Sequence, residues 1–556
     1  MGKKLPKTPT SPLTHFSSHF HLSHKFERKM SDAAKPEKRE IQDVDLLKWD
    51  PINGFKNVYS TCLLIFSVVI VMGLIGTSQT GLSSKTSPAV AYIMCWAALI
   101  WLTMVEGTQG SFVGLAPINP EIYKESHPIA YMCNKVMVKG DNLDRYLMGR
   151  QLMVCCIVFI INMSAGPAGD VELWGLSEGA KTAFFGVGLA MIFFTAMIGQ
   201  LNSQVNASVC MLDYCDNYFA VFTMWVAMAI EFTGLLHASY LIQMAVTKCA
   251  GAEMESKEPP RNETQNIFYW GRCLMSLAIL SFCGVVTVYA LFTGQTTIWE
   301  GIPPIVSFII FLVLMSIVGM LEGMQIAFFA CAKLRAEERG SSKFAKMTAQ
   351  LLFKGNGNNL PGFMIGRQLT VVSCMFFVAR VTSVKMAEGA GNMFGVSDGT
   401  QKLFDTGLLG ALFLTIVGSI AWQLVASAFP IGFMANPLTY ILLRIALFIE
   451  MTGVCNGAWV LAYIHAKLAG FQRDEVYIGT AEERAAKQMG DDYTQLQVGA
   501  GHMTKLPAYV QNAPNALVEL METDDAVKEF VRQLSLHGGD LEKYVEDLKE
   551  KPVESA

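Results

Sequence analysis

The chain has 556 residues, of which 52% are hydrophobic and only 16% are charged. Soluble proteins carry about a quarter charged residues, so much of this surface must face something other than water. The formal net charge of −4 at pH 7 gives no basic excess that would attract nucleic acid. The composition excludes an ordinary soluble domain and predicts a protein embedded in a lipid bilayer.

The first 57 residues contain eleven Lys or Arg and no apolar run of signal-peptide length. We expect residues 1–57 to form a basic, disordered tail on the cytoplasmic side of the membrane, since positive charge favours that side.

Ten apolar runs follow, each long enough to cross a hydrocarbon layer of about 30 Å as a helix. They are expected near residues 58–78, 88–106, 147–165, 180–201, 218–245, 270–293, 302–323, 364–384, 404–425 and 437–466. A polar linker, 246–269, separates the first five runs from the last five. Residues 467–556 form a soluble tail, in which two apolar stripes, Leu517–Leu534 and Leu541–Leu548, predict amphipathic helices that self-associate or bind a partner protein.

An internal duplication relates residues 58–245 to residues 270–466. Three motifs recur in order: Glu106-Gly107-Thr108-Gln109 as Glu322-Gly323-Met324-Gln325, Gly149-Arg150-Gln151 as Gly366-Arg367-Gln368, and Glu231-Phe232-Thr233-Gly234 as Glu450-Met451-Thr452-Gly453, at offsets of 216, 217 and 219 residues. Five helices per half is an odd number, which predicts that the second half enters the membrane upside down. The expected fold is an all-α polytopic membrane protein with ten transmembrane helices as two inverted five-helix repeats and a soluble helical carboxy-terminal tail.

Two of the repeated motifs supply candidate substrate-binding residues, namely Glu106, Gln109, Gln151, Glu322, Gln325 and Gln368. We expect the Glu-Gly-X-Gln motifs to end the second and seventh helices and the Gly-Arg-Gln motifs to open the third and eighth. A glutamine amide both donates and accepts hydrogen bonds, which suits an uncharged hydroxylated solute, whereas an anion would require arginine forks. Arg150 and Arg367 either reach the membrane interface or pair with the two glutamates. Inversion would place Gln109 and Gln151 near one mouth of the solute path and the other two glutamines near the opposite mouth.

The third repeated motif supplies candidate ligands for a coupling cation. Glu231 and Glu450 are expected in the middle of the fifth and tenth spans, where an ionisable side chain is costly and marks function. Thr233 and Thr452 add oxygen ligands of the kind that hard cations prefer. Two alternatives stay open: each Glu is protonated or bonded to a neighbouring helix, or Glu106 and Glu322 bind the cation instead. The spans contain no motif of a catalytic metal or nucleophile, so we expect no enzyme activity, no cofactor and no resident metal.

Glu-Gly-X-Gln followed about forty residues later by Gly-Arg-Gln, once in each half, resembles the sodium-coupled silicic acid transporters of diatoms. Cys210-Met211-Leu212-Asp213 also matches a tetrad of that family, whereas the second half reads Phe429-Pro430-Ile431-Gly432. The resemblance covers residues 55–467. It implies import of silicic acid with sodium for biosilicification, at the plasma membrane and at the silica-deposition vesicle.

Two alternatives remain within transport: a carrier or a passive channel for another small neutral hydroxylated solute, such as boric acid or glycerol. An inverted repeat with a cytoplasmic amino terminus places the sequon at Asn262 outside the cell and both termini inside. The same topology places a basic loop, Lys333 to Lys354, outside, which conflicts with the preference of basic loops for the cytoplasm.

Overall fold

The computed structural model describes residues 46–47, 50–169, 171–249, 251, 258–298, 301–354, 359–386 and 391–485. Ile41–Ile478 form one compact unit, and the residues from Gly479 onward belong to a second unit. The unit that ends at Ile478 contains the whole duplication and every candidate site residue. The two amphipathic helices expected in the tail lie outside the described residues.

The two halves contain the same helices in the same order. The first half consists of α2 (Pro51–Gly76), α3 (Pro88–Leu115), α4 (Pro128–Met137), α5 (Asn142–Ala165), α6 (Glu178–Lys181), α7 (Leu189–Phe193), α8 (Asn202–Ala207), α9 (Met211–Cys215), α10 (Tyr218–Phe232) and α11 (Ala238–Cys249). The second half consists of α12 (Glu263–Phe292), α13 (Pro304–Ala332), α14 (Lys343–Leu352), α15 (Asn359–Thr382), α16 (Asp398–Asp405), α17 (Leu408–Leu414), α18 (Ala421–Ala428), α19 (Pro430–Ala435), α20 (Pro437–Met451) and α21 (Gly457–Ala469). Short helical segments of other types include η2 (Pro120–Tyr123), η4 (Phe194–Leu201) and η7 (Thr415–Ile420), and α22 (Asp474–Ile478) comes after the second half.

Seven helices in the described part of the chain are long and apolar enough to span a membrane: α2, α3, α5, α12, α13, α15 and the continuous run Leu408–Ala428. The run Glu178–Ala207 passes the same test as a pair of helices bent by 47°. The expected fifth and tenth spans are not single helices, because each divides into two short ones, α10 with α11 and α20 with α21. Gly234 and Gly453, both with φ of 79°, follow the first helix of each pair, and a left-handed glycine ends a helix.

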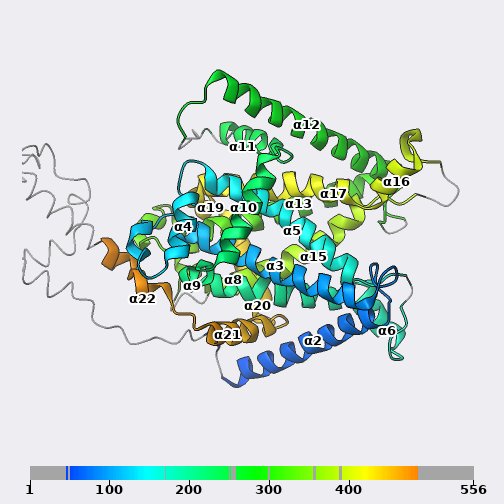
Figure 1. Cartoon of the computed structure of the whole chain (residues 1–556), viewed down its shortest axis with the longest axis horizontal. Helices are drawn as coiled ribbons and strands as arrows, with labels where there is room; N and C mark the ends of the chain where they lie inside the picture. The colour runs from blue at the N-terminus through cyan, green and yellow to red at the C-terminus, as the bar shows by residue number, and fades with distance from the viewer. Residues whose placement is uncertain are drawn as a thin grey trace, which may run out of the picture. The chain divides into compact units, whose positions relative to one another are not determined.

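Equivalent contacts between the halves reveal a two-fold relation. Ser60 on α2 donates its hydroxyl to the carbonyl of Val454, and this hydroxyl accepts from the amide of Gly457. The equivalent Ser276 on α12 makes the same two contacts with the backbone of Leu235 and Ala238. The first helix of each half therefore holds the helix break of the other half. In Figure 1, α2 and α21 form one outer layer, and α12 and α11 form the opposite one.

The halves run in the same direction, which contradicts the expected inversion. Gln325 Nε2 donates to its equivalent, Gln109 Oε1, at 3.3 Å. Further along both helices, a Cβ on Gly114 would lie 3.5 Å from the carbonyl oxygen of Phe329. The contact partner moves from Gln325 to Phe329 along α13 as the position on α3 moves from Gln109 to Gly114, so the two helices are parallel. The two-fold axis therefore runs along these helices rather than across them. Because both are candidate membrane spans, the axis lies along the membrane normal.

The broken fifth segment explains why the inversion argument failed. Asp216, before α10, accepts hydrogen bonds from the backbone amides of Ile129 and Ala130 at the start of α4. Glu258, after α11, forms an ion pair with Arg145 at the start of α5. The segment therefore begins and ends at the same end of the molecule. With the bent pair Glu178–Ala207 counted as one span, each half has four candidate crossings among the described residues, so the second half enters from the same side as the first.

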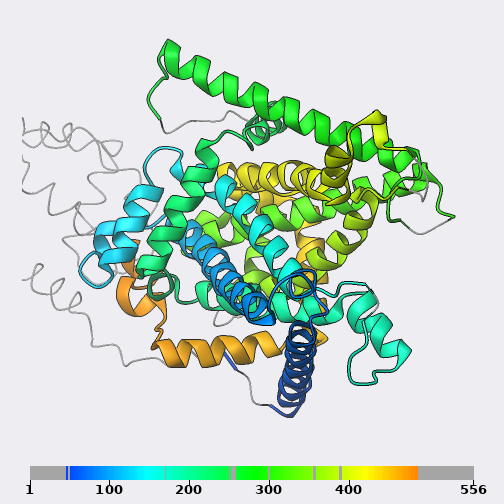
Figure 2. The ribbon, with the colours of Figure 1, turned by 45° about the vertical axis from the view of Figure 1, so that its right-hand side comes forward.

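The hydrophobic core has a central part and two equivalent flanking parts. The central part lies among α3, α5, α10, α13, α15 and α20, and it remains between the outer layers when the molecule is turned (Figure 2). One flanking part joins α2, α8 and α21, and the other joins α11, α12 and α18. Gly149 and Gly366 lie directly against the carbonyls of Ala227 and Ala446, leaving no room for a Cβ. These glycines let α5 approach α10 and α15 approach α20 closely.

Candidate functional site

A buried polar network lies where the halves meet, and it consists of two clusters of equivalent residues. The first cluster is built on Glu106 and includes Arg150, Gln200, Gln204 and Gln368; the second is built on Glu322 and includes Arg367, Ser419, Gln423 and Gln151. Each cluster therefore contains one glutamine from the opposite half. Polar side chains within membrane-spanning segments are rare and mark solute or ion sites.

Each cluster is centred on a buried ion pair. Arg150 Nη2 lies 2.5 Å from Glu106 Oε2, and Arg367 Nη2 lies 2.5 Å from Glu322 Oε1. The arginines also donate to the next residue along the chain, Gln151 at 2.6 Å and Gln368 at 2.5 Å. The sequence left open whether these arginines reach the interface or pair with the glutamates, and they pair. A buried ion pair is tolerated when hydrogen bonds satisfy most of the remaining groups. The glutamines supply most of these bonds here, and Arg367 Nε also donates to the carbonyl of Leu321, whereas Arg150 Nε has no partner among the described residues.

Glutamines of the fourth segment in each half complete the clusters. Gln204 Nε2 donates to Glu106 Oε2 at 2.9 Å, and its equivalent, Gln423, donates to Glu322 Oε2 at 2.8 Å. Gln423 Nε2 also lies 3.2 Å from Gln151 Oε1. In the opposite direction, Gln368 Nε2 donates to Gln200 Oε1 at 2.8 Å. Amide hydrogen bonds therefore cross between the halves on both sides of the axis.

The axis itself passes between Gln109 and Gln325, which are fully or almost fully buried. Gln109 Nε2 has no hydrogen-bond partner among the described residues, and the same holds for Gln204 Oε1 and Gln423 Oε1. A buried polar atom without a partner costs about 1–3 kcal/mol. These three atoms all lie in the network, which therefore has unused hydrogen-bonding capacity for a hydroxylated solute.

The structure corrects two expectations about the motifs. Glu106 and Gln109 lie within a regular helix that continues to Leu115, and the second copy lies within a helix that continues to Ala332. The Gly-Arg-Gln motifs likewise lie inside α5 and α15 rather than at their first residues. The four glutamines are not divided between two mouths, because Gln109 contacts Gln325. The first correction arises because α3, α5, α13 and α15 are longer than the apolar runs in the sequence, and the second because the parallel halves bring equivalent motifs to one level.

The motif glycines serve packing rather than an unwound backbone. Gly107 lies under the ring of Tyr214, and Gly323 lies under the ring of Phe433. A Cβ at either position would overlap the aromatic ring, so glycine allows α9 and α19 to pack against α3 and α13.

The candidate cation ligands lie at helix ends, not at mid-helix. Glu231 is in the last turn of α10 and lies 2.8 Å from His237 Nε2, whereas Glu450 is in the last turn of α20 and accepts from Trp459 Nε1 at 3.2 Å. Thr233 and Thr452 are exposed, and their hydroxyls donate to carbonyls of their own helices. The glutamates therefore contact neighbouring residues of their own broken segments.

The Cys210–Asp213 tetrad anchors the segment that ends the unit. Asp213 contacts His127 Nε2 at 2.9 Å and accepts from the backbone of Gln472, while the amide of Leu212 donates to Asp474. Lys333 lies 2.9 Å from Asp474. Burial raises the pKa of Asp474, and the Lys333 ammonium acts in the opposite direction. The second half has no equivalent tetrad because α22 occurs once.

Four network residues were not predicted as site residues: Gln200, Gln204, Ser419 and Gln423. The recurrence of Gln204 and Gln423 at the offset of 219 was the signal that could have identified them. Gln200 and Ser419 differ in type, so the repeat gives no signal for them.

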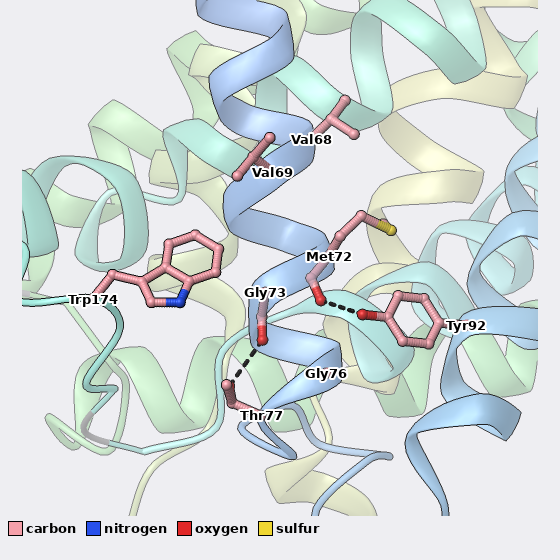
Figure 3. Close-up of a pocket in the computed structure, with 8 residues that line it drawn as sticks. All are labelled: Val68, Val69, Met72, Gly73, Gly76, Thr77, Tyr92 and Trp174. Atoms are coloured by element: carbon pink, nitrogen blue, oxygen red, sulfur yellow. Dashed lines mark hydrogen bonds between the residues drawn. The ribbon is translucent and has the colours of Figure 1, made fainter.

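The hollows on the outer surface are apolar and separate from this network. One lies on α2, lined by Val68, Val69, Met72, Gly73, Gly76, Thr77, Tyr92 and Trp174 (Figure 3). Another lies on the equivalent face of α12 and includes Leu280, Gly284 and Phe413. Among the residues that line them, neither groove contains a charged side chain, in contrast to the network.

The family model of the silicon transporter matches residues 48–556. The chain belongs to the silicon transporter family. The match confirms the resemblance carried by the repeated motifs, and with the spanning helices it makes this silicon transporter a polytopic membrane protein. No curated protein and no solved structure matches the chain.

Proposed function

We propose that this protein imports silicic acid together with sodium, by alternating access between its two halves. The observation that carries the proposal is the buried network of glutamines and paired glutamates where the halves meet. Membership of the silicon transporter family supports the same substrate.

The chemistry of the network suits silicic acid. Silicic acid is a neutral molecule with four hydroxyls at physiological pH, and each hydroxyl donates and accepts a hydrogen bond. The network offers amide donors, amide acceptors and carboxylates. Each arginine is already neutralised by a glutamate, so the network carries no excess positive charge that would favour an anion over a neutral solute.

Coupling to an ion follows from the neutrality of the solute, and the resemblance to sodium-coupled transporters makes sodium the proposed ion. An uncharged molecule does not respond to the membrane potential, so its accumulation requires a co-transported ion. Glu106 and Glu322 are each already paired with an arginine, which disfavours the binding of a second cation at these carboxylates. We assign the sodium to Glu231 and Glu450, because these carboxylates lie at helix breaks, where backbone carbonyls supply additional oxygen ligands.

Alternating access requires the halves to move about the network. Parallel repeats related by an axis along the membrane normal rock against each other in known transporters. The ion pairs and axial glutamines of the network are buried, so the present conformation is closed around them. Hydrogen bonds that cross the axis would break and re-form as the site opens to either side.

The distribution of basic residues sets the orientation in this proposal. The loops that follow α3 and α13 contain three and six Lys or Arg, and residues 1–57 contain eleven. Segments 77–87, 166–188, 293–303 and 383–407, at the opposite end, contain four lysines and no arginine. The end at which α3 and α13 finish is therefore cytoplasmic, with both termini. This orientation places the basic loop from Lys333 to Lys354 in the cytoplasm, which agrees with the preference of basic loops for that side. It also places Asn262 on the cytoplasmic side, both in the plasma membrane and in the membrane of the silica-deposition vesicle.

The test is uptake by proteoliposomes that contain the purified protein. Silicic acid is offered with an inward sodium gradient, with equal sodium on both sides, and with the gradient collapsed by a sodium ionophore. We expect accumulation above the external concentration only with the gradient. Boric acid and glycerol, offered at the same concentration, separate a silicic acid carrier from a carrier of neutral hydroxylated solutes. Equal rates in all sodium conditions would indicate a passive channel and overturn the proposal.

A further inference from the structure

The two clusters of the network differ at one pair of equivalent positions. Gln200 in the first half corresponds to Ser419 in the second, at the offset of 219 that also relates Gln204 to Gln423. The glutamates, arginines and remaining glutamines of the clusters are otherwise identical in type. Any functional difference between the clusters must therefore begin at this pair.

In the first cluster, the amide of Gln200 bridges two groups. Its nitrogen donates to Glu106 Oε1 at 3.3 Å, and its oxygen accepts from Gln368 Nε2 at 2.8 Å. Gln368 is 5% exposed, so the opposing glutamine of this cluster is both buried and hydrogen-bonded, although Gln204 Oε1 and Arg150 Nε have no partner among the described residues. The protein itself supplies both a donor to the carboxylate and an acceptor for the opposing glutamine.

In the second cluster, the much shorter Ser419 makes neither contact. Its hydroxyl lies 3.2 Å from Gln423 Nε2, and no second amide reaches Glu322 from the described residues. Gln151 Nε2, the equivalent of Gln368 Nε2, has no acceptor in the described part of the chain, and Gln151 is partly exposed. The oxygen of the fully buried Gln423 is without a partner there, as is that of the equivalent Gln204 in the first cluster, so the clusters differ in the free Gln151 amide and in the space left by Ser419.

We propose that the second cluster is the single solute-binding cluster and that Gln200 replaces the solute in the first. One hydroxyl of silicic acid donates to Glu322 and accepts from Gln151 Nε2, which are the two contacts that the Gln200 amide makes in the first cluster. Another hydroxyl donates to Gln423 Oε1. The inference rests on the proposed function, and it makes Ser419 the residue that keeps the site open.

Exchange of the two residues tests this assignment. The purified protein in lipid nanodiscs is dialysed against germanic acid labelled with radioactive germanium, a neutral tetrahydroxy analogue of silicic acid. We expect one molecule bound per chain. Ser419→Gln should lower the affinity at least about tenfold, because its amide would fill the cluster and take two of its hydrogen bonds. Gln200→Ser should raise the stoichiometry from one to two.

Ser84→Gln, the same substitution at an exposed position between α2 and α3 and outside the network, is the matched control, and its affinity should equal that of the wild type. Thermal unfolding checks the fold of each variant. If Ser419→Gln unfolds, the stoichiometry of Gln200→Ser decides alone. An unchanged affinity in Ser419→Gln, or a single binding site in Gln200→Ser, would overturn the inference. If the wild-type protein still takes up silicic acid, the proposed function is unaffected by that result. A wild-type protein that neither binds germanic acid nor takes up silicic acid would instead refute the proposed function.

Discussion

The first and second halves of this silicon transporter share a scaffold but differ in how the scaffold is completed. Both place a Glu–Arg pair inside the membrane and both donate a glutamine to the other half. The first half closes its cluster with Gln200, whereas the second leaves a short serine at the equivalent position. The difference shows that a duplicated framework can keep two equivalent ion pairs and still differ in access, because Gln151 of the second cluster is partly exposed whereas Gln368 of the first is buried.

The largest expected effect tests the part that the halves share. Arg150→Met and Arg367→Met should each destabilise the protein by about 3–5 kcal/mol, because each leaves a buried carboxylate without its partner. The measurement is thermal unfolding of the purified variants. Arg145→Met, which removes a partly exposed ion pair with Glu258, is the control and should cost no more than about 1 kcal/mol. A large loss of stability in only one of the two variants would contradict the structural equivalence of the two ion pairs.

Alanine at the glutamines that cross between the halves should separate the clusters. Gln151→Ala should weaken solute affinity by about 5- to 150-fold, from the loss of about 1–3 kcal/mol, with little loss of stability. Gln368→Ala should lower stability by a similar free energy and leave affinity nearly unchanged, because its partner is Gln200. Concentration-dependent uptake and thermal unfolding are measured on both variants at matched reconstitution. Equal affinity losses would show that both clusters bind solute.

The close helix contacts provide a test of the repeat that involves no polar group. Gly149→Ala and Gly366→Ala should each cost about 1–3 kcal/mol, since the added methyl would overlap a backbone carbonyl and force α5 or α15 outward. Gly179→Ala, at a position with no neighbouring atom within 4 Å, should be neutral. Unfolding temperatures of the three variants measure the difference. If Gly149→Ala left the unfolding temperature unchanged, α10 would have to lie farther from α5 than the structure shows.

The smallest expected effect concerns orientation. Asn262 should carry no glycan in eukaryotic cells, because parallel halves place it on the cytoplasmic side. In intact cells, a membrane-impermeant maleimide should label Ser84→Cys, in the segment between α2 and α3 at the opposite end, and should not label Glu263→Cys until the cells are permeabilised. Ser84 is exposed and cysteine is close to serine in size, so the variant is expected to fold. A glycan on Asn262, or labelling of Glu263→Cys in intact cells, would reverse the orientation.

The sequence predicted the helical class, the duplication and the motif residues, because hydrophobic runs and repeated polar residues are local signals. It failed on the direction of the second half. The run 218–245 is apolar throughout, and its apolarity conceals the turn that begins at Gly234. Because this run was counted as one crossing, the predicted number of membrane crossings per half became odd instead of even. The predicted separation of Gln109 from Gln325 followed from the inversion that an odd number implies.

Other parts of the site depend on contacts that no local pattern contains. The pairing of Arg150 with Glu106 was one of two alternatives, and only packing of α5 against α3 selects it. The role of Gln200 depends on a glutamine 168 residues away, and its equivalent is a serine, so neither composition nor repetition marks it. The residues expected to bind sodium remain a prediction.

The most direct test of the account is the uptake of silicic acid by proteoliposomes that contain the wild type or Gln151→Ala, each driven by the same sodium gradient. The account predicts accumulation by the wild type above the external concentration. It predicts loss of uptake by the variant at low silicic acid and recovery when the concentration is raised about a hundredfold, which matches the upper end of the expected affinity loss. Unchanged uptake by the variant at low silicic acid, or no sodium-driven accumulation by the wild type, would contradict it.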